Sequence, residues 1–409
     1  MAVEVYDEDV FSDEAIRDPY PHYQRIRDLG PVVWLEQAGI HAVTRYDDVR
    51  AVLADADTFR SGEGVMFGEV ANQLTRGTTL ASDNPEHDLL RKVVAHRLTP
   101  RALRDERARI EACADEVLDR VATLARDGGV VEGVTMVAQA MPMAVVPPFL
   151  GFPQDAYDRL IPWASGAIES GAPFSSRTEQ AVAKAQELGR YAERLAAERG
   201  LLPDSLGADL LAAADRGEIS HAQCPALLMD YFGPSLETTI SVLGSALALF
   251  AENPDQWQLL REDPTRHGGA FNEVVRMESP LRAFTRVAAH DTEIDGSPVA
   301  AGTRVAVFYA SANRDERKWE RPDDFDILRD NADHLGLGYG VHGCAGQGLA
   351  RMEFGALLTR LAEHIEHIEL AGEPTRVVNG LLRAWGELPL RMHLDPSYHL
   401  SQAASGGAA

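Results

Sequence analysis

The segment HLGLGYGVHGCAGQGLARMEFGALLTRLAEHI combines glycines, one cysteine and a long helical pattern. Four glycines between positions 336 and 343 precede Cys344, and glycine at this density lets the backbone approach a large flat group closely. The cysteine opens the helix, and the partial charge at a helix N-terminus lowers the pKa of a thiol. Cys344 is therefore a candidate thiolate. The alternative is an inert cysteine in a glycine-rich turn, since free cysteine is among the most buried residue types.

A polar group stands in the middle of the longest helical pattern, QCPALLMDYFGPSLETTISVLGSALALFAENP. Glu237 and Thr238, with a serine before them and a second threonine after them, contradict both helix propensity and burial. A functional role explains them better than a plain threonine pair in a core helix. Pro234 removes one helical hydrogen bond and clashes with the carbonyl of Asp230, so it should kink the helix here.

Glu273 and Arg276 lie three residues apart in a helical segment, which puts a carboxylate and a guanidinium on one face. The two groups can form a bidentate bridge. The spacing alone is weak evidence, because an acid and an arginine three apart are common on solvated helix faces. The motifs ANRD and RPDDF, which follow before Cys344, favour a structural brace.

Together these motifs resemble the cytochrome P450 family of haem-thiolate monooxygenases, and specifically its soluble bacterial members. Gly340, His342, Cys344 and Gly346 match the family's cysteine-loop pattern F-x-x-G-x-H-x-C-x-G, and Leu337 stands where phenylalanine is usual. The resemblance extends over nearly the whole chain. It implies haem b with Cys344 as the axial iron ligand, O2 as co-substrate, and insertion of one oxygen atom into the substrate. Leu337 would pack beside the sulfur and tune its surroundings without removing the ligand.

The resemblance also assigns roles to the two helical motifs. Thr238 would hold the oxygen at the haem, and Glu237 would relay protons from solvent. Glu273 and Arg276 would form the brace that holds the meander beneath the cysteine loop.

One position of the brace departs from the family pattern. An arginine or histidine is usual just before Phe325, whereas this chain has Asp324. Arg321 or Arg329 would then supply the third partner.

Haem carries two propionates, which need cationic or hydrogen-bonding partners inside a protein. The resemblance points to His87, Arg91, Arg286 and His342 for this role. His87 and Arg91 lie four apart on one helical face, although an exposed i,i+4 pair is the simpler interpretation of that spacing alone.

The resemblance places the substrate among apolar and aromatic side chains. The predicted pocket residues are Met66, Phe67, Leu74, Phe174, Phe232, Leu281, Ala283, Phe284 and Trp385. They are similar to those of bacterial members that act on small aromatic compounds such as methoxybenzoates and alkoxyphenols, which implies hydroxylation or oxidative O-demethylation. Arg76 or Arg282 would suit a carboxylate substrate, but Asp230 argues against a strongly anionic ligand. Core packing explains any single aromatic equally well.

The run RKVVAHRLTPRALR, from Arg91 to Arg104, has five basic residues and no acid in a chain of net charge −24. In the family this helix lies on the thiolate side of the haem, where an electron-transfer partner docks. A basic patch there would steer an acidic iron–sulfur ferredoxin, which a ferredoxin reductase supplies with electrons from NAD(P)H. The alternative is an ordinary solvated helix face.

The elements that must position these residues are mostly helical. Periodicity predicts a helix after Pro19 that ends at Gly30, and then helices almost continuously from Tyr46 to about residue 280. An early hairpin turns at QAG, paired runs flank Asp295-Gly296, and strands return near the end. We predict a mostly α protein with one large P450-type domain over residues 1–400, small β-sheets on it, and a flexible tail over 401–409.

Composition excludes several classes of function. The net charge of −24 repels phosphate backbones and anionic lipids, so we expect neither nucleic acid nor a membrane as a partner. The N-terminus carries no export signal and the three cysteines are widely spaced, which favours a soluble cytoplasmic protein, expected to be a monomer.

Two rival functions stay open. A gas-sensing haem protein would not need Glu237-Thr238, and a peroxide-driven enzyme would not need the basic run.

Overall fold

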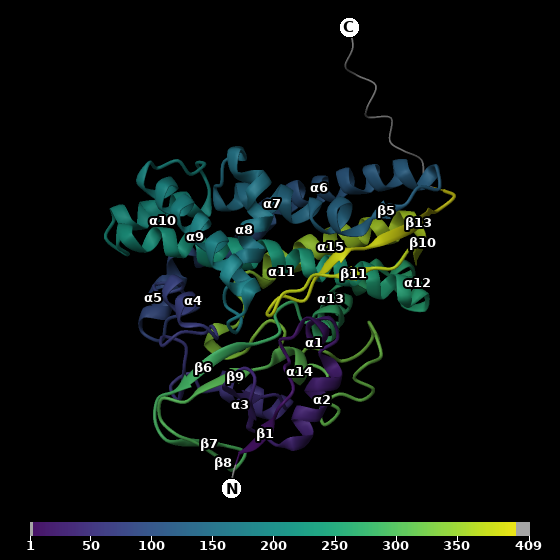
Figure 1. The fold of residues 1–409 in the computed structure, drawn as a ribbon. Helices are drawn as coiled ribbons and strands as arrows, with labels where there is room; N and C mark the ends of the chain where they lie inside the picture. The colour runs from purple at the N-terminus through teal and green to yellow at the C-terminus, as the bar shows by residue number, and fades with distance from the viewer. Residues whose placement is uncertain (1–2, 398–409) are drawn as a thin grey trace.

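Residues 3–397 are described in a computed structural model of the chain, and helices dominate it (Figure 1). The longer helices are α2 (Tyr20–Leu29), α3 (Tyr46–Ala54), α5 (Glu86–Ala95), α6 (Pro100–Arg126), α7 (Ala140–Leu150), α8 (Tyr157–Glu169), α9 (Ser176–Ala197), α10 (Leu206–Asp215), α11 (Cys224–Glu252), α12 (Pro254–Glu262), α13 (His267–Met277) and α15 (Gln347–His364). Short helices are α1 (Asp13–Arg17), α4 (Glu69–Leu74) and α14 (Tyr309–Ala312). The mostly α fold is therefore confirmed.

Helix α11 forms the centre of the helical body and is buried along most of its length. It packs against α7, α8, α9, α13 and α15, which explains why it is apolar on nearly every face. It continues through Pro234 without interruption. The segments Gly133–Leu150 and His221–Glu252 are long and apolar enough to cross a membrane, but both are mostly buried inside the protein. Burial on this scale is typical of core helices.

The larger sheet has six strands and lies with α1, α2, α3 and α14 below the helical body in the view of Figure 1. Its order is β1 (Glu4–Tyr6), β2 (Val33–Leu35), β3 (Ile40–Val43), β9 (Arg304–Val307), β6 (Phe284–Ala288) and β4 (Phe59–Arg60). The β2–β3 hairpin is antiparallel, as the sequence predicts, and β3 then pairs in parallel with β9. The early hairpin and the strands after residue 283 thus meet in one sheet, although they are far apart in the sequence.

The hairpin at Asp295-Gly296 is confirmed as β7 (Thr292–Ile294) and β8 (Ser297–Val299). Both turn residues have positive φ, 43° for Asp295 and 75° for Gly296. A two-residue turn of this kind matches the twist of the strands, and aspartate followed by glycine tolerates it best.

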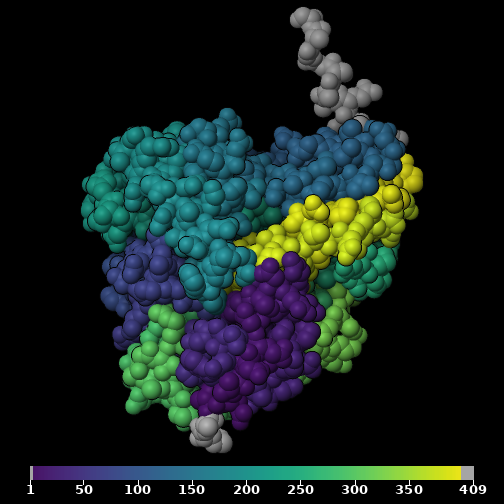
Figure 2. Space-filling view, viewed as in Figure 1, coloured from purple at the N-terminus to yellow at the C-terminus, as the bar shows by residue number. Residues whose placement is uncertain are grey.

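The C-terminal strands form two smaller sheets. β13 (Pro389–Leu394) pairs with β10 (Ile365–Leu370) and with β5 (Val131–Glu132), while β11 (Thr375–Arg376) pairs with β12 (Trp385–Glu387). Figure 2 shows residues near the N-terminus beside the C-terminal strands on one face.

The single domain over residues 1–400 stays a prediction, and the tail at 401–409 lies outside the described residues.

Candidate functional site

A cavity of about 220 Å³ lies between the middle of α11 and the cysteine loop. Cys344, His342, Arg91, Arg286 and Thr238 all line it. These residues come from α5, α11, β6 and the loop before α15, so the fold brings together groups that are up to 253 positions apart in the sequence. Most of the exposed surface inside the cavity is apolar.

The glycines of the cysteine loop are required by close contacts with the rest of the chain. Gly338 and Gly340 have positive φ, 72° and 67°. A Cβ atom at Gly340 would lie 2.7 Å from the carbonyl oxygen of Leu53, and one at Gly336 would lie 2.6 Å from a Val275 methyl. Gly340 and Gly336 therefore let the loop pack against α3 and α13. The sequence interpretation explained the glycines only by the close approach of a flat ligand.

Cys344 lies three residues before α15, which begins at Gln347 with Gly346 as its N-cap. Its backbone N–H donates to the carbonyl of Leu337 at 2.8 Å, and Leu337 and Gly346 also line the cavity. Burial raises the pKa of the Cys344 thiol, and the backbone amides of Gly346 and Gln347 only partly offset this effect. The expectation of a lowered thiol pKa is therefore wrong for the protein by itself, because desolvation outweighs the helix terminus.

The four residues predicted to bind propionates lie together. Arg91, Arg286 and His342 line the cavity, and the rings of His87 and His342 are 4.6 Å apart, edge to face. Arg91 donates to the carbonyl of Gly343 at 2.7 Å, and Arg286 donates to the carbonyl of Thr285 at 2.8 Å.

These residues fit the propionates of a haem. The Nε2 atoms of His87 and His342 are both buried without a hydrogen-bond partner among residues 3–397. Burial, together with the charges of Arg286 and Arg91, lowers the pKa of His342 to about 3, so this ring is neutral and keeps one N–H to donate. Two arginines and two unsatisfied imidazole nitrogens at one end of a cavity that contains a thiol suit a ligand with two carboxylates.

Thr238 and Glu237 occupy different positions relative to the cavity. Thr238 lines it, and its hydroxyl donates to the carbonyl of Pro234 at 2.6 Å, which leaves the oxygen lone pairs free to accept. Glu237 is buried beside the cavity and does not line it. Burial raises the pKa of Glu237 to about 8, so the carboxyl holds its proton at neutral pH. A buried carboxyl that is protonated at neutral pH thus lies next in the chain to a cavity-lining hydroxyl.

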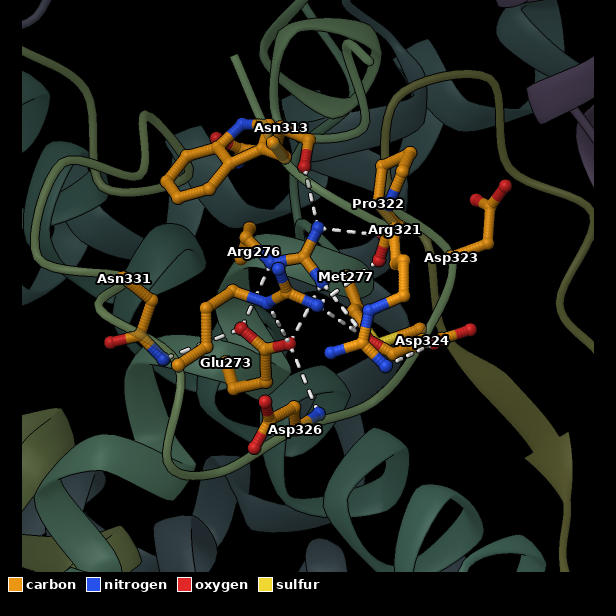
Figure 3. Close-up of polar contacts among 12 residues, drawn as sticks. Glu273, Arg276, Met277, Asn313, Arg321, Pro322, Asp323, Asp324, Asp326 and Asn331 are labelled. Atoms are coloured by element: carbon orange, nitrogen blue, oxygen red, sulfur yellow. Dashed lines mark hydrogen bonds and ion pairs between the residues drawn. The ribbon is translucent and has the colours of Figure 1, made fainter.

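The Glu273–Arg276 brace has the geometry predicted from the sequence (Figure 3). Arg276 donates from Nε and Nη2 to the two carboxylate oxygens of Glu273, at 2.9 and 2.8 Å, and both side chains are fully buried. Burial alone would raise the pKa of Glu273, but Arg276 and Arg329 hold it below its usual value.

Arg329 is the third partner of the brace. It donates from Nε to Glu273 at 3.0 Å, whereas Arg321 pairs with Asp324 in an exposed position. Of the two substitutes that the sequence suggested for the missing basic residue, the structure therefore selects Arg329.

The brace connects to the cysteine loop through Asn313. Arg276 donates to the carbonyl of Asn313 at 2.9 Å, and the side-chain oxygen of Asn313 accepts the N–H of Leu335 at 2.7 Å. Leu335 comes directly before the glycine-rich part of the loop, so the brace fixes the position from which the loop starts.

A second cavity, of about 90 Å³, adjoins the first. Leu281 and Phe284 line both cavities, whereas Met66 and Leu74 line only the second. Four of the predicted pocket residues thus face these two cavities.

The other five predicted pocket residues line neither cavity. Phe174 is 88% exposed, and Phe232 is fully buried with its ring stacked on Phe152 at 4.7 Å. Ala283 is buried in the core at the sheet.

Two aromatic rings complete this group. Phe67 packs edge to face on Phe11 at 5.2 Å, and Trp385 packs under the guanidinium of Arg376 at 3.3 Å from the ring centroid. Arg282, considered for a carboxylate substrate, is buried and bound to Tyr23. Apolar character in the sequence did not distinguish cavity walls from core.

The cavity wall formed by α11 includes residues that sequence reasoning did not assign to the pocket. Tyr231, Ser235, Thr239 and Val242 line the first cavity with Pro234 and Thr238. Asp230, which the sequence weighed against a strongly anionic ligand, also lines it. These residues recur at intervals of about four, as expected for one face of a helix.

The basic run is not one helix. It spans the end of α5, a short 3₁₀ turn (His96–Leu98) and the start of α6. Arg91 faces the cavity, and Arg97 is bound to Asp209, so Lys92, Arg101 and Arg104 are the exposed basic residues left. The run still adjoins the cysteine loop, because Arg91 contacts Gly343 and Leu103 approaches Gly348.

Comparison with known proteins adds independent information. The family model described as Cytochrome P450 matches residues 196–380. Cytochrome p450 CYP199A2 of Rhodopseudomonas palustris is 34% identical over 387 residues, which cover 94% of this chain and 93% of that protein. A steroid C26-monooxygenase of Rhodococcus jostii is 30% identical over 395 residues, 92% of this chain and 82% of that protein.

A solved structure gives the same result. The cytochrome P450 CYP268A2 of Mycobacterium marinum, in complex with pseudoionone, superposes with a TM-score of 0.85. The two chains are 30% identical, and the match covers 95% of this chain and all of the other.

Proposed function

The chain belongs to the cytochrome P450 family of haem-thiolate monooxygenases, and on that basis we propose that it oxidises a small hydrophobic, aromatic substrate. The reaction inserts one oxygen atom from O2, as a hydroxylation or an oxidative O-demethylation. The observation that carries the proposal is the cavity itself, in which Cys344 and the basic side chains face the Thr238 segment of α11 across a mostly apolar space.

We assign the cofactor contacts to residues at two sides of this cavity. Cys344 would hold the iron of haem b, and Arg91, Arg286 and His342, with His87 behind it, would hold the propionates. Haem with a cysteine thiolate supplies the activation of dioxygen in this family.

The polar residues of α11 would supply protons in a space that otherwise excludes water. The Thr238 hydroxyl donates to its own helix and can accept a hydrogen bond from the cavity side. Glu237 holds a proton at neutral pH and lies in the next position of the chain. Proton transfer from Glu237 to the cavity, through Thr238 or a water molecule, is therefore the role that we propose for the pair.

The small aromatic substrate class rests on the composition of the cavity wall. Leu80, Val242, Leu281 and Phe284 give this wall apolar side chains. An aromatic ring fills such a space with few rotatable bonds and gains from contact with Phe284.

We also propose that electrons come from NAD(P)H through a reductase and an iron–sulfur ferredoxin that docks at the basic run. The run adjoins the cysteine loop, because Arg91 donates to the carbonyl of Gly343. We expect a monomeric enzyme in the cytoplasm. The net charge of −24 favours the second part of this expectation, because it disfavours contact with anionic membranes.

Two measurements test the proposed function. The reduced protein with carbon monoxide should show a Soret band shifted far to the red, and Cys344→Ser should abolish that shift while Cys113→Ser and Cys224→Ser keep it. Oxygen-dependent NADH consumption with a ferredoxin and its reductase should then yield an oxidised aromatic product. A normal spectrum in Cys344→Ser would remove the thiolate assignment, and turnover with peroxide alone would favour the peroxide-driven alternative.

A further inference from the structure

Asp230 lies at the junction of the two cavities. Its side chain lines both of them, together with Leu80, Leu281 and Phe284. Asp230 is partly exposed although it lies on the inner face of α11. Its exposed surface therefore faces the cavities. Asp230 is thus a carboxylate in a space with mainly apolar walls.

The hydrogen bonds that Asp230 receives come from one short segment of the protein. Its Oδ2 accepts the N–H of Thr79 at 2.8 Å, and the Thr79 hydroxyl and the Leu80 amide also interact with the carboxyl. A carboxylate offers about four acceptor positions, so these donors leave capacity for a ligand.

Asp230 has no directly paired cation in the part of the chain that the structure describes. Arg91, the cation that acts on it from a distance, hydrogen-bonds to Gly343 instead. An enclosed carboxylate without a counter-charge is costly unless further donors reach it. It repels an anionic ligand and favours one that brings an O–H or N–H group.

We propose that Asp230 selects substrates with a hydroxyl or amino group, whose O–H or N–H donates to this carboxylate at the end remote from the oxidised carbon. This inference rests on the proposed function and narrows its substrate class to aromatic hydrogen-bond donors, phenols or amines. Asp230 is a specificity-determining residue in this proposal and takes no part in the chemical step. Carboxylate-bearing aromatics are excluded by charge repulsion.

Binding titrations with compounds that share one reacting end test the proposal. The haem-loaded protein is titrated with 4-ethylphenol, its methyl ether 4-ethylanisole, 4-ethylbenzylamine and 4-ethylbenzoate, with the optical change at the haem as the readout. A hydrogen bond to a charged group predicts that the phenol binds roughly ten- to a hundredfold more tightly than its ether. The benzoate should bind more weakly than either. The ratio between phenol and amine distinguishes a neutral hydroxyl from an ammonium as the preferred donor.

Asp230→Asn supplies the decisive comparison. The amide oxygen of asparagine can still accept the Thr79 N–H, so the fold is kept while the charge is lost. The phenol-to-ether preference should fall about tenfold or more, and the benzoate should gain affinity. Ser170→Ala is the matched control, because Ser170 lines the second cavity and its hydroxyl donates to the carbonyl of Ala167 at 2.8 Å. It should leave every ratio unchanged.

Failure of the inference and failure of the proposed function give different results. Equal binding of the phenol and its ether by the wild type, or an unchanged ratio in Asp230→Asn, would overturn the role of Asp230. No optical response to any of the aromatic compounds would instead contradict the aromatic substrate class. In that case decan-1-ol and its methyl ether replace the aromatic pair, and equal affinity for these two would overturn the inference as well.

Discussion

At the residue scale, burial decides the protonation states in the site. Desolvation raises the pKa of Cys344 and Glu237 and lowers that of His342, and each of these shifts favours the neutral form at neutral pH. Desolvation also raises the pKa of Asp230, but only to about 6, so this carboxyl is mostly ionised at neutral pH. For Cys344, a positive iron would reverse the preference for the neutral form, because a metal ion favours the thiolate. We therefore expect Cys344 to become a thiolate when the cofactor binds.

Thr238→Ala removes the hydroxyl that we place beside the reacting oxygen. We expect product formation to fall by roughly ten- to a hundredfold, since a positioned proton-transfer group contributes at least this much. Substrate binding and reductant consumption should persist, with hydrogen peroxide released in place of product. Peroxide and product measured per NADH consumed check this, and unchanged coupling would exclude Thr238 from proton delivery. Thr239→Ser is a suitable control, because its hydroxyl also donates within the helix, to the carbonyl of Ser235.

Glu237→Gln tests the raised pKa through stability. The carboxyl pKa is about 8 in the folded protein, against an ordinary value of 4.5 in an unfolded chain. Between these pH values the folded state holds a proton that the unfolded state has lost, so the free energy of unfolding decreases as pH rises. Glutamine removes this decrease.

The variant should therefore match the wild type near pH 4.5 and exceed its free energy of unfolding by roughly 2–4 kcal/mol at about pH 9. Urea unfolding of the haem-loaded proteins at both pH values measures the difference. An equal stability at the higher pH would show that Glu237 is ionised in the folded state.

At the element scale, the brace connects α13 to the segment that leads into the cysteine loop. Arg276 on α13 donates to the carbonyls of Asn313 and Pro322, and the side-chain oxygen of Asn313 in turn accepts the N–H of Leu335. Glu273 keeps the guanidinium in place and recruits Arg329 from the loop that follows. One helix thus determines where the cysteine loop begins.

Arg329→Gln should loosen this connection. It removes a charged hydrogen bond to the fully buried Glu273, so we expect a loss of about 1–3 kcal/mol in the free energy of unfolding and faster loss of haem. Arg321→Gln is the matched control, because Arg321 makes an exposed pair with Asp324 that should contribute less than about 1 kcal/mol. Unfolding midpoints and haem-transfer rates compare the two. Equal effects of both substitutions would contradict the assignment of Arg329 as the third partner.

At the scale of the whole molecule, an acidic protein keeps a small basic area next to its cysteine loop. Arg97 is bound to Asp209, so the exposed positive charge of this area comes from Lys92, Arg101 and Arg104, which form no ion pair within residues 3–397. An acidic ferredoxin would be repelled by most of the remaining surface, and this area would set its docking orientation.

Reversal of Lys92 and Arg101 to glutamate should slow electron transfer from the ferredoxin by roughly tenfold at low salt and flatten its salt dependence. Substrate affinity should stay the same, because neither residue lines the cavities. Stopped-flow reduction at several ionic strengths measures the effect. Arg60→Glu, an exposed residue of β4, is the control for overall charge. Unchanged reduction kinetics in the double variant would place the docking surface elsewhere.

The candidates for the chemical roles and for the structural brace could be identified from the sequence. Cys344 with its glycines, the Glu237–Thr238 pair and the Glu273–Arg276 spacing are local patterns, because helix geometry puts residues three or four apart on one face. The mostly helical fold and the two hairpins follow from periodicity and turn residues in the same way.

Only the tertiary structure decided which distant side chains share a space. Phe232 and Phe284 look alike in sequence, yet one packs in the core and the other lines both cavities, since that difference depends on how α8, α11 and β6 pack together. Arg329 and Asp230 likewise acquire their surroundings from segments more than fifty residues away. The direction of the Cys344 pKa shift is also tertiary, because burial is a property of the assembled fold and is absent from any local pattern.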